Sequence, residues 1–442
     1  MGKHYVVSFF LLIFWQNAIA QTPYYPPIQG AQWDTLTPSD AGWCSDDFSE
    51  LYSFLDSSQT RAFIVLQGGK RVIEKYFHSF KADSAWYWAS AGKSLTAFLV
   101  GLAQEQGHLN IEDPSNLYLG NNWTSCNSND EAAIKIRHHL EMSTGLSDTL
   151  SNLNCIAPSC LNCMTTPGTR WSYHNAPYTL LREVIENATN QGINLFHFQQ
   201  ITQKTGISGI YAWLPGDLNV FFSTPRSMAR FGLLMLRKGV WNTDSLLRDQ
   251  SYFNSMITQS QPENQAYGYL WWLNNTSNFM VPLVRLQFPG QLSPSSPIDM
   301  YSAIGKNGQI INVIPSADLV VIRMGENPDS NVSVPWNYNE EIMRRLARVI
   351  CNLSLYEEPL IKNTIKIWKS QSPQPQLHIQ SERSALLRVS QFDIRGLKVQ
   401  EHYFSKNTIN AQIPLQNQKS GLYIFIVEDA EGNVYRKKVV VD

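Results

Sequence analysis

Hydrophobic residues are concentrated in segments that predict strands and helices. Strands are predicted at 62–67 and 71–78, and the glycine pair at 68–69 suits the positive φ angles of a type I′ turn, so a β-hairpin is predicted. Between 95 and 102 the apolar residues recur three and four positions apart, which predicts a helix with a buried stripe that ends at Gly107. The same criteria predict helices at 46–55, 176–189, 228–238 and 339–351, and strands at 269–273, 310–313 and 319–324.

The order of these elements predicts two structural domains. Within residues 39–356, strands lie towards both ends and helices lie between them, which predicts an α+β fold: an antiparallel β-sheet backed by helices, with a helical subdomain. Residues 21–38 are expected to form an extended leader. Residues 357–376 have the composition of a linker, and five short alternating runs in 377–442 predict a small all-β sandwich.

The composition narrows the possible partners and the location. The 442 residues are 43% hydrophobic and 16% charged, as in a globular protein, and a net charge of −1 gives no electrostatic reason to bind nucleic acid or an anionic membrane. Residues 1–20 have the pattern of a secretory signal peptide: Lys3 precedes an apolar run too short to span a membrane, and 18–20 supply a cleavage site. The mature chain is therefore expected to begin at Gln21, outside the cytoplasm, and no other stretch is a candidate membrane span.

Six cysteines follow the predicted cleavage site, and an even number favours disulfides in an exported protein. We expect Cys44 to pair with Cys351, which would tie the first helix of the domain to the last, and Cys126 to join the cluster at 155–163. No histidine lies at ligand spacing from that cluster, so a zinc site is disfavoured and no metal is predicted.

Ser90 and Lys93 are the first candidates for chemistry. They are three residues apart near the start of the predicted helix, so their side chains share a face. A serine hydroxyl becomes a good nucleophile when a neighbouring base takes its proton, and burial can lower the pKa of a lysine enough for it to be that base. The spacing also arises by chance in a chain of this length. The adjacent His138 and His139 point to different faces of a helix and are interpreted as structural.

Two later stretches supply partners for this pair. Tyr173 and Asn175 follow a Pro-Gly turn; a tyrosine phenolate can act as a general base, and an asparagine amide can orient substrate. The glycine-bearing stretch 301–309 runs into a predicted strand, where Gly305 would let substrate approach the backbone closely. A backbone N–H from this stretch would face the Ser90 N–H and give an oxyanion two donors.

With these stretches in this order, residues 40–355 resemble the serine β-lactamase-like hydrolases, which include class C β-lactamases, DD-peptidases, esterases and 6-aminohexanoate-dimer hydrolases. The resemblance implies that Ser90 is the nucleophile, Lys93 its proton acceptor and Tyr173 the second base. It also implies that Asn175 contacts substrate, that the Ser90 and Lys306 N–H groups form the oxyanion hole, and that no cofactor is needed. The matching segments are Ser-Ala-Gly-Lys at 90–93, Ile-Arg-His-His-Leu-Glu-Met-Ser-Thr-Gly-Leu at 136–146, Pro-Gly-Thr-Arg-Trp-Ser-Tyr-His-Asn at 167–175, and the stretches 223–236 and 267–272.

The third motif departs from the penicillin-recognising pattern. Where β-lactamases and DD-peptidases usually carry Lys-Thr-Gly, this chain has Ala303-Ile304-Gly305, so the lysine that would face a substrate carboxylate is missing. The departure favours an esterase or amidase of the aminohexanoate-dimer type, acting on a small or peptide-like substrate. A β-lactamase or DD-peptidase remains an alternative, because the Lys306 side chain could supply a cation. A second alternative is a non-catalytic binding or sensor protein on the same fold.

The C-terminal module carries its own resemblance. Phe-Asp-Ile-Arg-Gly at 392–396, Gly-Leu-Tyr-Ile-Phe at 421–425 and the basic pair before the last apolar run at 437–441 look like a type IX secretion C-terminal sorting domain. That resemblance implies that the secretion machinery is a partner, and that the protein is translocated across the outer membrane of a Gram-negative bacterium to be secreted or held at the cell surface. A generic carbohydrate-binding or spacer sandwich is the alternative.

Overall fold

The protein is represented by a computed structural model, which describes residues 23–149, 152–216, 218–328, 336–350, 353, 365–370, 375–381, 384–393, 398–415, 420–430 and 434–441. The predicted signal peptide at 1–20 lies outside these residues. Within them, no helix combines the length and the apolar character needed to cross a membrane.

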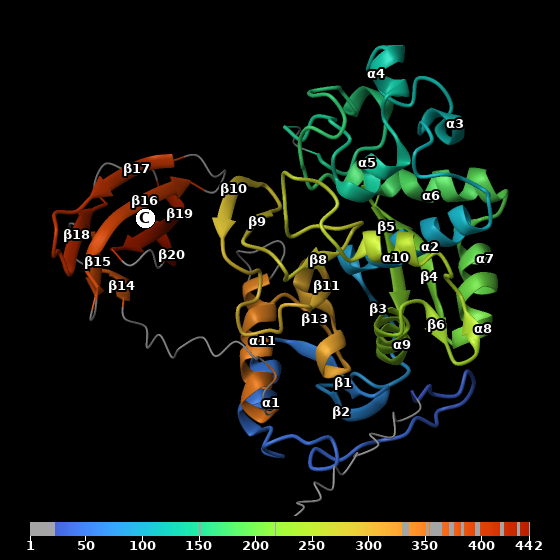
Figure 1. The fold of residues 1–442 in the computed structure, drawn as a ribbon, viewed down its shortest axis with the longest axis horizontal. Helices are drawn as coiled ribbons and strands as arrows, with labels where there is room; N and C mark the ends of the chain where they lie inside the picture. Colours follow the sequence, from blue (N-terminus) through green and yellow to red (C-terminus); the bar gives the residue numbers. More distant parts are fainter. Residues whose placement is uncertain are drawn as a thin grey trace, which may run out of the picture.

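The larger domain is built on a six-stranded antiparallel sheet with the strand order β2-β1-β13-β12-β11-β8 (Figure 1). Strand β1, from the start of the domain, pairs with β13, from its end, and also with β2 in the predicted hairpin. This confirms the α+β fold with strands contributed by both ends of the domain. The strands are β1 (Thr60–Gln67), β2 (Lys70–Tyr76), β8 (Trp272–Leu273), β11 (Tyr301–Gly305), β12 (Gln309–Ile314) and β13 (Leu319–Gly325).

Helices cover both faces of this sheet. Phe63 and Val65 of β1 pack into one core with α1 and α11, whereas Ile64 and Leu66 pack into another with α2 and α9. Because successive strand side chains point to opposite faces, a strand between two helical layers must be apolar at nearly every position. The helices are α1 (Ser49–Ser57), α2 (Gly92–Glu105), α9 (Pro225–Leu236) and α11 (Trp336–Val349).

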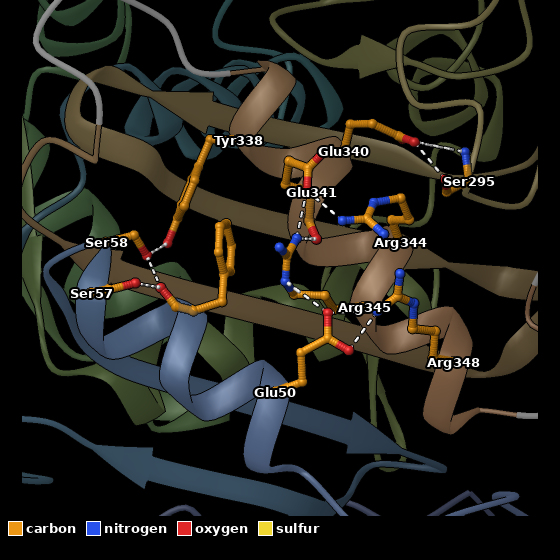
Figure 2. A network of polar contacts seen from close by, with 11 residues as sticks. Glu50, Ser57, Ser58, Ser295, Tyr338, Glu340, Glu341, Arg344, Arg345 and Arg348 are labelled. Atoms are coloured by element: carbon orange, nitrogen blue, oxygen red, sulfur yellow. Dashed lines mark hydrogen bonds and ion pairs between the residues drawn. The ribbon is translucent and has the colours of Figure 1, made fainter. Parts of the chain in front are cut away.

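Polar contacts join the two helices on the α1 side of the sheet (Figure 2). Glu50 of α1 accepts a hydrogen bond from Arg348 of α11 at 2.5 Å. The Tyr338 hydroxyl, at the other end of α11, lies 2.7 Å from Ser58 Oγ, just beyond α1. Exposed ion pairs are worth only ~0–1 kcal/mol, so the apolar side chains between these helices contribute more to their packing.

A second, small sheet was not predicted from the sequence, and it positions the segment before Ser90. Its order is β3-β5-β4, with β3 (Trp86–Tyr87), β4 (Gly209–Leu214) and β5 (Leu218–Ser223). The strand predicted at 269–273 is limited to β8, because Leu270 has a φ of 61° that interrupts the extended backbone. The remaining elements of this region are α7 (Ile193–His197), α8 (Gln203–Thr205), α10 (Gln250–Met256), β6 (Val240–Trp241), β7 (Asp244–Ser245), β9 (Asn278–Val281) and β10 (Val284–Pro289).

The helical subdomain, at the top of Figure 1, is cross-linked by disulfides. Cys126 pairs with Cys163 and Cys155 pairs with Cys160, which confirms that Cys126 joins the cluster. Cys44 is also disulfide-bonded, and its predicted partner, Cys351, lies outside the described residues. The helices here are α3 (Asn116–Leu119), α4 (Ser128–Ala132), α5 (Ile136–Glu141) and α6 (Asn175–Thr189).

The adjacent histidines of α5 make structural contacts. The His139 ring nitrogens lie 2.9 Å from Ser115 Oγ and 2.7 Å from the Pro177 carbonyl oxygen, and the backbone N–H of Lys135 donates to His138 Nδ1 at 3.0 Å. In the described part of the chain, no group of three or more His, Cys, Asp or Glu side chains is arranged to hold a metal ion.

The C-terminal region is a two-sheet β-sandwich, with strand orders β14-β15-β18 and β17-β16-β19-β20. Ile379, Val389 and Phe425 contribute to its core. Strand β14 lies within the predicted linker, 357–376, and pairs with β15, so the sandwich begins earlier than residue 377. Ile365 and Ile367 do alternate with a lysine, but the Ser- and Pro-bearing stretch at 370–375 gave the whole segment the composition of a linker. The strands are β14 (Ile365–Lys369), β15 (Gln376–Ser381), β16 (Leu386–Asp393), β17 (Lys398–Tyr403), β18 (Asn410–Pro414), β19 (Gly421–Asp429) and β20 (Val434–Val441).

Candidate active site

Ser90 lies in a short 3₁₀ turn, Ala89–Ala91, that runs directly into α2. The turn is anchored by the preceding residue, because the Trp88 N–H donates to the Phe221 carbonyl of β5 at 2.8 Å. Lys93 follows in the first turn of α2, and its Nζ lies 3.1 Å from Ser90 Oγ. The structure therefore brings together the two residues that the helical spacing placed on one face.

Lys93 is buried, with 4% of its surface exposed. Its Nζ donates to Asn175 Oδ1 at 2.9 Å and lies 4.1 Å from the ring centroid of Tyr178. Burial lowers the pKa of Lys93 to about 7, because the ammonium loses its hydration and no described carboxylate forms an ion pair with it. Above that pH the amine is mostly neutral and can accept a proton from Ser90.

Tyr173 is the second titratable group beside Ser90. Its side chain is 9% exposed, and its ring stacks on Trp272 with a centroid distance of 5.9 Å. Burial raises the pKa of Tyr173, and the nearby Ser90 hydroxyl lowers it in part. Within the described residues the Tyr173 hydroxyl has no partner at hydrogen-bond distance. At neutral pH this residue is therefore a phenol, better suited to donate a proton than to accept one.

Asn175 is the first residue of α6, and both ends of its amide are engaged by the protein. Its Oδ1 accepts from Lys93, and its Nδ2 donates to Asn154 Oδ1 at 2.8 Å. These contacts orient Lys93, and the substrate contact implied by the resemblance stays a prediction.

Strand β11 brings Gly305 against the segment that carries Ser90. A Cβ atom at position 305 would lie 2.5 Å from the Trp88 carbonyl oxygen and 3.0 Å from the Ser90 nitrogen, so a side chain here would displace backbone. Lys306 follows directly, with an exposed side chain. The two segments that hold the expected oxyanion donors, the N–H groups of Ser90 and Lys306, thus lie in contact.

The third motif presents no cation from the strand itself. Ala303 and Ile304 are both buried in β11, opposite Ile311 and Ile310 of β12. The nearest lysine in sequence, Lys306, lies beyond the strand. A substrate carboxylate would therefore not meet the lysine that penicillin-recognising relatives usually carry in this motif.

Two residues that sequence reasoning missed complete the surroundings of Lys93. Tyr178 covers the ammonium, and its position three residues after Asn175 on α6 would have indicated a shared face. Asn154, which binds Asn175, lies in an irregular loop, where no local pattern indicates its partner.

Comparison with known proteins agrees with this architecture. Residues 57–335, more than half of the chain, match the Beta-lactamase family, and the chain belongs to that family. Residues 373–442 match the secretion system C-terminal sorting domain, which indicates export. Both resemblances seen in the sequence are thereby confirmed. An uncharacterised protein from Alkalihalophilus pseudofirmus is 22% identical over 308 residues, which cover 61% of this chain and 84% of that protein.

Solved structures share the fold of the larger domain. A putative 6-aminohexanoate-dimer hydrolase from Bacillus anthracis matches with a TM-score of 0.53 at 17% identity, covering 74% of this chain and 91% of that one. A putative beta-lactamase from Bacteroides dorei matches with a TM-score of 0.54 at 17% identity, covering 69% and 99%. At these identities the similarity establishes the fold, and the substrate must be argued from the site.

Proposed function

We propose that this member of the Beta-lactamase family is a serine hydrolase that cleaves an ester or amide bond through an acyl-enzyme on Ser90. The observation that carries the proposal is the 3.1 Å separation between Ser90 Oγ and the Nζ of a buried lysine. Burying an amine without a counter-ion opposes folding, so its position beside a serine hydroxyl favours a chemical role for Lys93. The presence of Ser90, Lys93 and Tyr173 together argues against a non-catalytic sensor.

In the proposed reaction, Ser90 Oγ bonds to the substrate carbonyl carbon while its proton moves to Lys93 Nζ. The resulting oxyanion accepts hydrogen bonds from the backbone N–H groups of Ser90 and Lys306. The bond to the leaving group breaks as the leaving oxygen or nitrogen takes a proton from the Tyr173 phenol, which regains one from Lys93. Water then attacks the acyl-enzyme by the reverse sequence, and the acid product leaves as Ser90 recovers its proton.

The third motif guides the choice of substrate. Penicillins and cell-wall peptides carry a carboxylate, and Ala303 and Ile304 offer it no charge from β11. In those substrates the carboxylate is on the carbon attached to the scissile nitrogen, whereas a linear amide of the aminohexanoate-dimer type carries it several methylene groups away. We therefore infer that esters and linear amides of this type are better substrates than β-lactams or DD-peptides.

The test compares the mature protein with Ser90→Ala on a short-chain p-nitrophenyl ester and on a chromogenic cephalosporin. Wild type is expected to cleave the ester but not to open the lactam. In Ser90→Ala, kcat for the ester should fall by ~10³-fold or more, because the nucleophile is gone.

Ser94→Ala is a matched control, since Ser94 lies four residues after Ser90, in the first turn of α2, and donates to the Leu270 carbonyl. It should keep ester hydrolysis within a few-fold of wild type. Ester cleavage that survives in Ser90→Ala would remove Ser90 from the mechanism, and efficient lactam opening would move the protein to the penicillin-recognising branch.

We further infer that residues 1–20 direct export from the cytoplasm and that the C-terminal sorting domain directs translocation across the outer membrane, to the cell surface or the medium. The match of residues 373–442 supports the second step. In the native host, the protein from the cell surface or medium should begin at Gln21 by N-terminal sequencing. A chain that still begins at Met1 would contradict the proposed cleavage.

A further inference from the structure

Asn154 lies between a disulfide-closed loop and the candidate active site. Next to it in sequence, Cys155 bonds to Cys160. The preceding residue, Leu153, accepts a hydrogen bond from the Ala176 N–H at 3.0 Å, which ties the loop to the first turn of α6. Asn154 Oδ1 then accepts from Asn175 Nδ2 at 2.8 Å, and Asn175 Oδ1 accepts from Lys93 Nζ at 2.9 Å.

This chain of contacts fixes which end of the Asn175 amide faces Lys93. An amide presents an oxygen at one end and an N–H donor at the other. Because Asn154 offers an oxygen, Asn175 turns its NH₂ group towards the loop and its oxygen towards the amine. The amine then donates an N–H to Asn175, and its lone pair stays available for the Ser90 proton. A reversed amide would donate to that lone pair and compete with Ser90.

Within the described residues, few other groups act on this amine. The titratable groups that face Lys93 Nζ are the phenols of Tyr173, from the segment before α6, and Tyr178, from α6, with ring centroids at 5.3 and 4.1 Å. The Ser90 hydroxyl faces it from the turn before α2. A change in the dipole of Asn175 should therefore be visible in the titration of Lys93.

We propose that Asn154, held by the Cys155–Cys160 loop, is a positioning residue that sets the orientation of the Asn175 amide and thereby the basicity of Lys93. The inference rests on the proposed function, because it concerns the same proton acceptor. Nothing in it requires Asn154 to touch substrate.

The experiment measures kcat and KM for the ester as a function of pH in the full-length mature protein. Asn154→Ala frees the amide to reverse, so kcat should fall by about tenfold or more with little change in KM, and the apparent pKa of the rising limb should move down. Asn154→Asp keeps an acceptor for Asn175 and adds a negative charge, so kcat at high pH should stay within a few-fold of wild type while the apparent pKa moves up.

Asn162→Ala is the matched control, because Asn162 lies two residues beyond Cys160 and accepts a hydrogen bond from Ser125 Oγ rather than contacting Asn175. It should leave the pH profile unchanged. If Asn154→Ala fails to fold, the upward shift in Asn154→Asp with kcat retained still tests the proposal. An unchanged profile in Asn154→Ala, or equal losses of kcat in both Asn154 variants, would overturn it. If wild type and Ser90→Ala hydrolysed the ester equally well, the proposed function itself would be overturned.

Discussion

Replacing Lys93 by methionine is expected to lower kcat/KM for ester hydrolysis by ~10³-fold, within the range that removal of a general base produces. Methionine fills a similar space but cannot accept the Ser90 proton. The pH profile provides the diagnostic result. Wild-type activity should rise with pH through about 7 and then level off, because the neutral amine is the active form and burial lowers the pKa of Lys93 to about 7. In Lys93→Met the residual activity should not show this rise with pH.

The pH dependence of the free energy of unfolding distinguishes this loss of activity from misfolding of the variant. In the unfolded chain Lys93 has an ordinary pKa of 10.5, and in the folded protein it is about 7. Between these values the unfolded chain binds more protons, so the free energy of unfolding rises with pH across that interval. Lys93→Met should lose this rise and melt no earlier than wild type at neutral pH. If the activity of Lys93→Met still rose with pH near 7, a group other than Lys93 would control the activity.

The Ser90–Lys93 pair could be predicted from sequence because it depends on local geometry. The two residues are three positions apart where the 3₁₀ turn runs into α2, and this relation follows from helix dimensions. Asn175 approaches Lys93 from 82 residues further along the chain, and this long-range contact was expected from the family resemblance and not from spacing. The contact between Asn175 and Asn154 depends on a disulfide loop, and sequence spacing does not encode it.

The fold was predictable to a similar degree. Long apolar runs revealed β1 and β13, but alternation could not reveal the two-residue β3, which pairs with β5 far along the chain. The positive φ of Leu270 was equally hidden, because leucine rarely adopts it and only its surroundings impose it. The backbone around Ser90 is thus shaped by long-range pairing that residue type alone does not report.

Arg323→Met is expected to have the largest effect on stability, lowering the free energy of unfolding by about 3 kcal/mol. Arg323, on β13, is fully buried. Several buried carbonyl oxygens would lose a donor at once, at a cost of ~1 kcal/mol or more each, while removal of a buried charge would offset part of this. The guanidinium donates to Thr60 Oγ1 and to the backbone carbonyls of Ser58, Asn307, Gly308 and Glu326 at 2.5 to 3.2 Å.

The location of these carbonyls links stability to activity. Asn307 and Gly308 belong to the turn that begins with Lys306, whose N–H is the proposed second oxyanion donor. Arg323→Met should therefore also lower kcat for the ester by more than it raises KM. Urea denaturation and ester kinetics should be compared with Arg344→Met, which removes a partly exposed ion pair to Glu341 and should cost less than ~1 kcal/mol. If the two variants were equally stable, the hydrogen bonds of Arg323 would not hold this turn, and the oxyanion donor would need another support.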